Sequence, residues 1–296
     1  MLNSLLRNLA LLALAVAGTP AAGTPAGATP AGQPVRTATS YQLPSAVLGD
    51  SRQINIWVPP DYERSRDRYP VLYLLDGALD QDFNHIAGLA QLASLSWTFG
   101  PFIVVGVQTK QRISELTPAA SDPRYLAAFP QSGGAERFRR FLEEEVIPFV
   151  ERRLRTGPRR AIMGESLAGL FVVDTMLDRP QMFHDFVAVS PSLWWDDRRF
   201  VRAATAQLDA QRLQGRRLYL AVADEGGTMQ DGVGLLRGAI ARRAPALSVR
   251  YSDRSGFATH ATIYHGAAEE ALRWLYPAPP DNQGSTPWYM IEGRSP

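Results

Sequence analysis

The chain contains no cysteine, which excludes disulfide bonds, zinc sites built on thiolates and cysteine nucleophiles. An excess of one charge is also lacking, because 31 basic residues face 29 acidic ones and leave a net charge of +2. A protein that holds nucleic acid by its charge needs a larger basic excess, so we predict no nucleic-acid partner. Histidine is scarce, and the candidates for a catalytic base are only His85, His184, His260 and His265.

Long hydrophobic runs are missing as well. The apolar segment 9–16 follows Arg7 and is too short to cross a bilayer of about 30 Å as a helix. A basic start, a short apolar stretch and small residues predict a signal peptide over residues 1–22, with cleavage after Ala17 or Ala22. The alternative is an uncleaved anchor. We therefore predict a periplasmic or secreted protein with no stable membrane insertion after cleavage.

The rest of the chain divides into three parts. Residues 23–39 are rich in Ala, Gly, Thr and Pro and predict a disordered linker, because little in them can be buried. Residues 40–276 predict one catalytic domain, and residues 277–296 a C-terminal tail. Hydrophobic residues at 45% and charged residues at 20% of the 296 are typical of a globular protein.

Strand and helix patterns alternate through residues 40–276. Two strands around the Gly49-Asp50 turn predict an antiparallel hairpin, and later apolar runs predict strands buried on both faces. The predicted strands are Ser40–Ala46, Arg52–Val58, Tyr69–Leu75, Phe102–Val107, Arg160–Met163, Phe186–Val189, Leu218–Ala223 and Leu247–Tyr251. The predicted helices include Phe83–Leu95, Ala135–Leu154 with a bend or break at Pro148, and Leu167–Leu177. A helix candidate also follows each of the last three predicted strands, and Gly266–Leu275 is the last of these helices. This order predicts an α/β fold with a mostly parallel, doubly wound sheet led by an antiparallel hairpin.

A serine lies between a predicted strand and a predicted helix, in the segment Gly164-Glu-Ser-Leu-Ala-Gly169. A sharp turn at this point lifts the serine hydroxyl clear of the sheet, which is the geometry of a nucleophile elbow. The usual pattern has glycine two residues after the serine, where this chain has Ala168. The alternative is an ordinary strand-to-helix connection, but its position favours Ser166 as a nucleophile.

In hydrolases with this elbow, the acid and then the histidine follow the serine along the chain. His85 precedes Ser166, and no suitable acid separates His184 from it. His260, in the loop after the last predicted strand, is therefore favoured over His265. The acid is expected after the strand Leu218–Ala223, where Asp224 and Glu225 both remain candidates.

Four motifs in this order resemble the putative-esterase (esterase D-like) family of α/β-hydrolases. They are Tyr69-Pro-Val-Leu-Tyr-Leu-Leu-Asp-Gly77, Gly164-Glu-Ser-Leu-Ala-Gly-Leu170, Ser190-Pro-Ser-Leu-Trp-Trp195 and Thr259-His-Ala-Thr-Ile-Tyr-His265. The likeness covers roughly residues 40–276, and the Ser190 motif is most similar to the siderophore (enterobactin-type) esterases. The resemblance implies the α/β-hydrolase fold.

The resemblance also implies roles for individual residues. Ser166 matches the family nucleophile and His260 its histidine. Glu225 matches the acid of a Gly-x-x-Glu pattern, although Val222 stands in place of the glycine, and some siderophore esterases work with a Ser–His pair alone. The backbone N–H groups of Leu167 and Ala78 match the family's oxyanion donors.

These residues predict an exported serine hydrolase that cleaves carboxylic esters through an acyl-enzyme intermediate. The substrate would be a small-molecule ester, such as that of a siderophore, with Arg112 and Trp194 as candidate binding residues. We predict neither a cofactor nor a metal, and the oligomeric state stays open. The alternatives are an acyltransferase of the same fold and a catalytically inactive ligand-binding protein of the cell envelope.

Overall fold

The computed structural model describes residues 37–206 and 208–278. The predicted signal peptide, most of the predicted linker and the tail from residue 279 lie outside the described residues. Within the described ranges, no helix has both the length and the apolar character needed to span a membrane.

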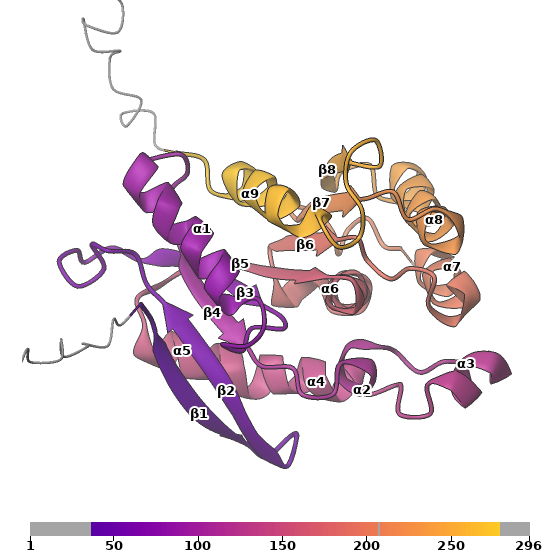
Figure 1. The fold of residues 1–296 in the computed structure, drawn as a ribbon, viewed down its shortest axis with the longest axis horizontal. Helices are drawn as coiled ribbons and strands as arrows, with labels where there is room; N and C mark the ends of the chain where they lie inside the picture. Colours follow the sequence, from indigo (N-terminus) through magenta and orange to yellow (C-terminus); the bar gives the residue numbers. More distant parts are fainter. Residues whose placement is uncertain (1–36, 207, 279–296) are drawn as a thin grey trace, which may run out of the picture. The chain divides into compact units, whose positions relative to one another are not determined.

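The described residues build one mixed β-sheet with the strand order β1-β2-β4-β3-β5-β6-β7-β8 (Figure 1). Its strands are β1 (Thr39–Ser45), β2 (Asp50–Trp57), β3 (Tyr69–Leu74), β4 (Ile103–Val107), β5 (Thr156–Glu165), β6 (Asp185–Val189), β7 (Arg217–Val222) and β8 (Ser248–Asp253). Strand β2 runs antiparallel to both of its neighbours, and the pairs from β4 through β8 are parallel. The predicted fold class is therefore confirmed.

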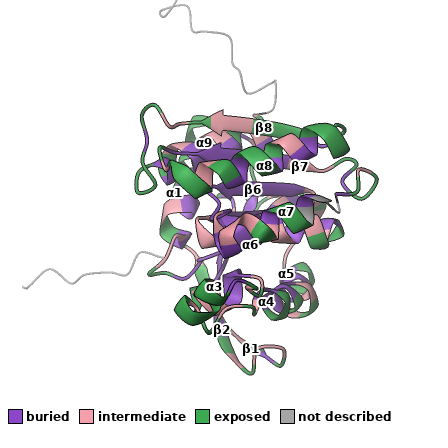
Figure 2. Ribbon diagram, turned by 90° about the vertical axis from the view of Figure 1, so that its right-hand side faces the viewer, coloured by how far each residue is buried: buried purple, intermediate pink, exposed green. Residues whose placement is uncertain are grey.

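Helices cover both faces of this sheet. The helices α1 (Phe83–Ser96) and α9 (Ile263–Leu275) pack on one face, and α4 (Ala135–Phe141), α5 (Ile147–Arg153), α6 (Leu167–Asp178) and α8 (Gly227–Arg243) belong to the core of the other. Burial follows this layering, since central strands such as β6 are buried and the edge strand β8 is mostly exposed (Figure 2). Continuous apolar runs mark the central strands because both of their faces are covered.

Shorter helices were not expected from the sequence. They are α2 (Arg112–Leu116) and α3 (Pro123–Ala128), together with 3-10 turns at Pro180–Met182 and Trp195–Arg198, whereas α7 (Arg199–Ala206) is the helix expected after the strand Phe186–Val189. All of them except the Pro180–Met182 turn lie in the connections after β4 and β6, at the carboxyl ends of those strands. Ligands of parallel α/β sheets bind at this edge, so these connections bring further side chains to it.

The long helix predicted over Ala135–Leu154 is divided by a π-helical segment, η1 (Leu142–Val146). The Ile147 N–H donates to the carbonyl oxygen of Leu142, five residues earlier. Pro148 follows directly, and its ring cannot provide an N–H to the helix. The predicted interruption at Pro148 is thus a local widening of the helix rather than a sharp break.

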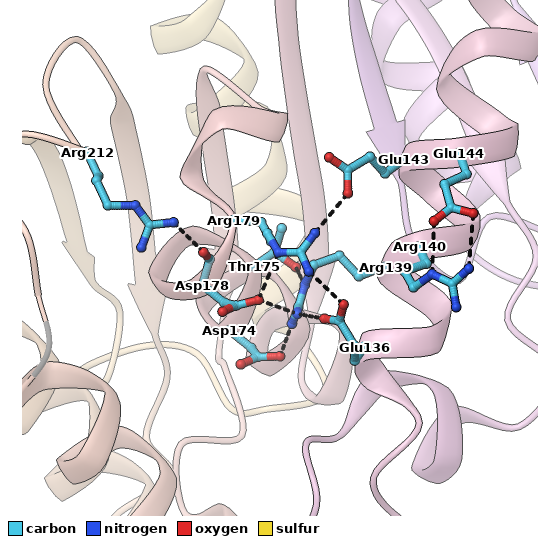
Figure 3. A network of polar contacts seen from close by, with 10 residues as sticks. All are labelled: Glu136, Arg139, Arg140, Glu143, Glu144, Asp174, Thr175, Asp178, Arg179 and Arg212. Atoms are coloured by element: carbon cyan, nitrogen blue, oxygen red, sulfur yellow. Dashed lines mark hydrogen bonds and ion pairs between the residues drawn. The ribbon is translucent and has the colours of Figure 1, made fainter.

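Helix α6 is fixed to α4 by a polar network around one buried arginine (Figure 3). The Arg139 side chain is only 3% exposed and pairs with Asp174, Asp178 and Glu136, at 2.9 Å from Asp178 and 2.5 Å from Glu136. Arg179 extends the network to Glu136 at 2.8 Å. Because α6 starts directly after Ser166, the network fixes the element that positions the predicted nucleophile.

Candidate active site

Three non-glycine residues with left-handed backbone conformations follow neighbouring parallel strands. Asp76 comes after β3 with φ of 49°, Ser166 after β5 with φ of 59°, and Ser190 after β6 with φ of 41°. Such conformations are strained for residues with a Cβ atom and persist mainly at functional sites. Residues with strained backbone conformations therefore cluster around Ser166, at the carboxyl edge of the sheet.

The elbow around Ser166 depends on two glycines. A Cβ atom added at Gly164 would lie 2.6 Å from the Cβ of Ala168, so β5 can meet the first turn of α6 only without a side chain there. A Cβ added at Gly169 would lie 2.9 Å from the Val189 carbonyl oxygen and 3.0 Å from the Pro191 Cα. The close approach to the turn after β6 thus falls at Gly169, while Ala168 faces Gly164.

Ser166 and His260 line one cleft of about 500 Å³. Its other walls come from the connections after β4, β6 and β7. The lining residues are Arg112, Ile113, Phe129, Ser166, Leu167, Ser192, Trp194, Trp195, Asp224, Glu225, Met229 and His260. The structure therefore brings together all the predicted site residues except Ala78.

His260 is held by Glu225 rather than by Asp224. Its Nδ1 lies 2.6 Å from Glu225 Oε1, and the Glu225 side chain is only 4% exposed. The hydrogen bond to this carboxylate raises the pKa of His260, against the opposite effect of burial. Asp224 acts through its backbone, since its N–H donates to the carbonyl oxygen of Ala258 at 2.9 Å and thereby fixes the loop that carries His260.

The Ser166 hydroxyl has a partner that sequence reasoning missed. Its Oγ lies 3.4 Å from Ser192 Oγ, and no hydrogen bond joins it to His260 among the described residues. Catalytic hydrogen bonds are often loose without substrate, and a rotation of the Ser166 side chain changes the direction of its hydroxyl. Ser192 belongs to the Ser190-Pro-Ser motif, which was the available signal, but the motif alone gave it no role.

The two predicted oxyanion donors differ in their availability. Leu167 is the first residue of α6 and lines the cleft, and N–H groups of a first helical turn have no partner within the helix. Ala78 is 1% exposed, and its N–H donates to Gln81 Oε1 at 3.0 Å. Gln81 is held in turn by its Nε2, which donates to the Thr109 carbonyl oxygen at 2.8 Å.

The two predicted binding residues line the cleft from different connections, Arg112 from the one after β4 and Trp194 from the one after β6. Arg112 begins α2, and its Nε donates to Asp76 Oδ2 at 2.9 Å while its side chain stays 43% exposed. Trp194 is half-buried and contacts the rings of Tyr125 and Phe129. Its neighbour Trp195 is fully buried and belongs to the core.

Further acids lie close to the cleft. Burial raises the pKa of Glu165, the residue before Ser166, to about 7, and the nearby positive charges of His260 and Arg112 oppose the shift. Burial also raises the pKa of Asp82 to about 6, with a further contribution from Asp76. Among the described residues, no group of three or more His, Asp or Glu side chains is arranged to hold a metal ion.

A serine on the turn after β5, with a histidine after β8 and its acid after β7, defines this protein as an α/β-hydrolase. A family model described as "Putative esterase" matches residues 45–251. The chain therefore belongs to the putative esterase family, as the sequence motifs indicated.

Several relatives carry esterase names. The chain is 31% identical to the apo-salmochelin esterase of Escherichia coli over 257 residues, which cover 82% of this chain and 73% of that protein. It is 44% identical to the ferri-bacillibactin esterase BesA of Bacillus subtilis over 69 residues, but this match spans only 24% of BesA. Among solved structures, the IroE-like serine hydrolase of Shewanella oneidensis has a TM-score of 0.70 and 27% identity, over 81% of this chain and 80% of that one. These likenesses place the chain among the carboxylic ester hydrolases, near the siderophore esterases.

Proposed function

We propose that this protein is an exported serine esterase that cleaves small-molecule esters through an acyl-enzyme intermediate. The observation that carries the proposal is the shared cleft, in which Ser166 on its strained turn faces the same cavity as His260, held by Glu225. Strained residues of this kind are kept where they serve a function. Membership of the putative esterase family supports a carboxylic ester as the substrate.

In the acylation step, Ser166 Oγ attacks the ester carbonyl carbon while His260 accepts its proton. The Glu225 carboxylate stabilises the imidazolium that forms, because it lies 2.6 Å from His260 Nδ1. His260 then gives the proton to the departing alcohol. In the second step His260 takes a proton from water, the water oxygen attacks the acyl carbon, and Ser166 leaves with the proton returned by His260. The first step needs the Ser166 O–H to point toward His260.

The negative oxygen of each tetrahedral intermediate would rest on the N–H of Leu167. The N-terminus of α6 adds its positive dipole end at the same place. Ala78 can serve as the second donor when Gln81 Oε1 releases its N–H. One donor of this kind lowers the barrier by about 3 kcal/mol, so Leu167 alone accounts for a large part of the expected stabilisation.

We place the substrate among siderophore esters. The half-buried Trp194 offers a flat apolar wall, and the exposed part of Arg112 offers a positive charge on the same cleft. An aromatic acyl group bearing negative charge fits both features. The similarity to the apo-salmochelin and ferri-bacillibactin esterases supports this substrate class.

The decisive experiment compares the natural protein with Ser166→Ala. We expect the natural protein to hydrolyse p-nitrophenyl butyrate and a siderophore trilactone, and to be labelled by a fluorophosphonate. Ser166→Ala should lose both properties, whereas Ser190→Ala, which removes a buried hydroxyl after the next strand, should keep them. Hydrolysis that survives Ser166→Ala would refute the nucleophile, and activity confined to acetylated or feruloylated sugars would refute the siderophore assignment.

A further inference from the structure

Ser192 makes two contacts with Ser166 although 26 residues separate them. Its N–H donates to the Ser166 carbonyl oxygen at 3.0 Å, and the two hydroxyl oxygens lie 3.4 Å apart. Ser192 is 2% exposed and lines the cleft. Within the described part of the chain its hydroxyl has no hydrogen-bond partner other than Ser166. A buried hydroxyl directed at a single atom is a specific arrangement, because buried polar groups need partners.

The turn that carries Ser192 is fixed on several sides. Gly169 lets the first turn of α6 approach Pro191 closely, and the Trp195 N–H donates to the Ser192 carbonyl oxygen at 3.1 Å. The ring of Trp195 is fully buried, and its Nε1 donates to the Pro118 carbonyl oxygen at 3.1 Å. Backbone and core contacts therefore set the position of Ser192, independently of its hydroxyl.

The strand order places Ser192 on the same side of Ser166 as His260. Strand β6 follows β5 in the sheet, and β7 and β8 come next in the same direction. Ser192 follows β6, and His260 follows β8. The Ser166 hydroxyl that lies beside Ser192 is therefore already on the side from which His260 approaches.

We infer that Ser192 is a positioning residue, whose hydroxyl donates a hydrogen bond to Ser166 Oγ and holds it ready for attack. The inference rests on the proposed function of Ser166. A hydroxyl has one proton to donate, and donation from Ser192 leaves the Ser166 proton free to pass to His260. The same bond stabilises Ser166 Oγ when it gains negative charge, both as it attacks the ester and as it leaves the acyl-enzyme.

The test is Ser192→Ala, with Ser192→Cys and Ser190→Ala beside it. We expect Ser192→Ala to lower kcat for p-nitrophenyl butyrate and the fluorophosphonate labelling rate about tenfold, with KM changed less than about twofold. Ser192→Cys keeps a weaker donor and should give an intermediate rate. This variant still tests the hydrogen bond if the alanine variant folds poorly. Ser190→Ala removes a buried hydroxyl that has no partner among the described residues, and should leave both rates unchanged.

Each outcome bears on a separate claim. If the natural protein is active, Ser166→Ala is inactive and Ser192→Ala keeps its full kcat and labelling rate, the positioning role is wrong and the proposed function stands. Equal losses in Ser192→Ala and Ser190→Ala would also overturn it, because they would show a general effect on the turn. If the natural protein neither hydrolyses esters nor becomes labelled at Ser166, both proposals fail together.

Discussion

At the residue scale, the ionisation of His260 is set mainly by one neighbour. The hydrogen bond that the imidazole donates to Glu225 raises the pKa of His260, burial lowers it, and the charges of Glu165 and Arg112 act in opposite directions. A general base must be neutral to accept a proton, so the rate should rise with pH as His260 loses its proton above its usual value near 6.5. Glu165, with a pKa of about 7, titrates in the same region.

Replacement of Glu225 tests this dependence. Glu225→Gln removes the carboxylate that favours the imidazolium, so the pKa of His260 should fall and the acid limb of kcat/KM should move to lower pH. The change also removes the group that orients the ring, and we expect kcat to drop about a hundredfold or more. A pH profile of ester hydrolysis measures both effects. Asp224→Asn is the matched control and should leave the acid limb in place; an unchanged profile in Glu225→Gln would show that a Ser–His pair suffices.

The sequence predicted which types of residue form the site, but it did not decide between two adjacent acids. Ser166 followed from its place between a strand and a helix, His260 followed from chain order, and the structure places both in one cleft. The sequence left open whether Asp224 or Glu225 contacts His260, because a backbone hydrogen bond from Asp224 to the next loop decides which side chain points inward. The contact of Ser192 with Ser166 depends on packing between β6 and α6, which no local pattern encodes.

At the element scale, the junction of α4 and α6 depends on Arg139. Arg139→Ala would leave Asp174 buried without its cation, and we expect the free energy of unfolding to fall by about 3 kcal/mol in urea titrations at pH 7.5. Burial already raises the pKa of Asp174 to about 6. Between these two values, Asp174 is therefore protonated in the folded state and ionised in the unfolded state, where its pKa has the ordinary value of 3.8. The loss should therefore be smaller at pH 5 than at pH 7.5.

Arg140, the next residue, is the control for this prediction. It pairs with Glu144 at 2.9 Å on the surface of the same helix, and both side chains are about half exposed. Exposed pairs contribute little, so Arg140→Ala should leave the free energy of unfolding nearly unchanged. Similar losses in the two variants would contradict the importance of the buried network in Figure 3.

The elements that could be predicted are those with a long or strongly apolar pattern. Each predicted strand has an observed counterpart within a few residues, although β5 begins at Thr156, four residues before the predicted start. Its first residues pair with β3 but are polar and half exposed, so they carry no apolar signal. The short helices α2 and α3 have too few turns for a clear period, which is why the sequence did not indicate them.

At the scale of the whole molecule, the proposal of export leads to a direct prediction. The full-length chain, expressed in a bacterium with an intact secretion pathway, should be recovered outside the cytoplasm with a new N-terminus after Ala17 or Ala22. Intact-mass measurement of the recovered protein identifies the cleavage point. A variant with Leu12→Arg interrupts the apolar stretch and should stay uncleaved. An intact Met1 terminus on the natural protein in every cell fraction would refute the proposal.

The class of the fold was readable from the sequence, and the strand order was not. Alternating strands and helices indicate a parallel sheet, but they do not show that β4 lies between β2 and β3. That arrangement depends on long-range pairing, such as the antiparallel register of Ile54 with Val107. The resemblance to a known family supplied what local periodicity lacked, because a family implies its whole topology.

The left-handed residues Asp76, Ser166 and Ser190 have a consequence for anyone who would engineer this protein. Each costs about 1–3 kcal/mol of folding free energy, and glycine would relieve that cost at any of them. Selection for heat resistance alone would therefore favour glycine along this rim and, at Ser166, would delete the proposed nucleophile itself. Changes that raise thermal stability at these positions would lower activity, so stabilising substitutions belong in helices away from this edge, such as α5.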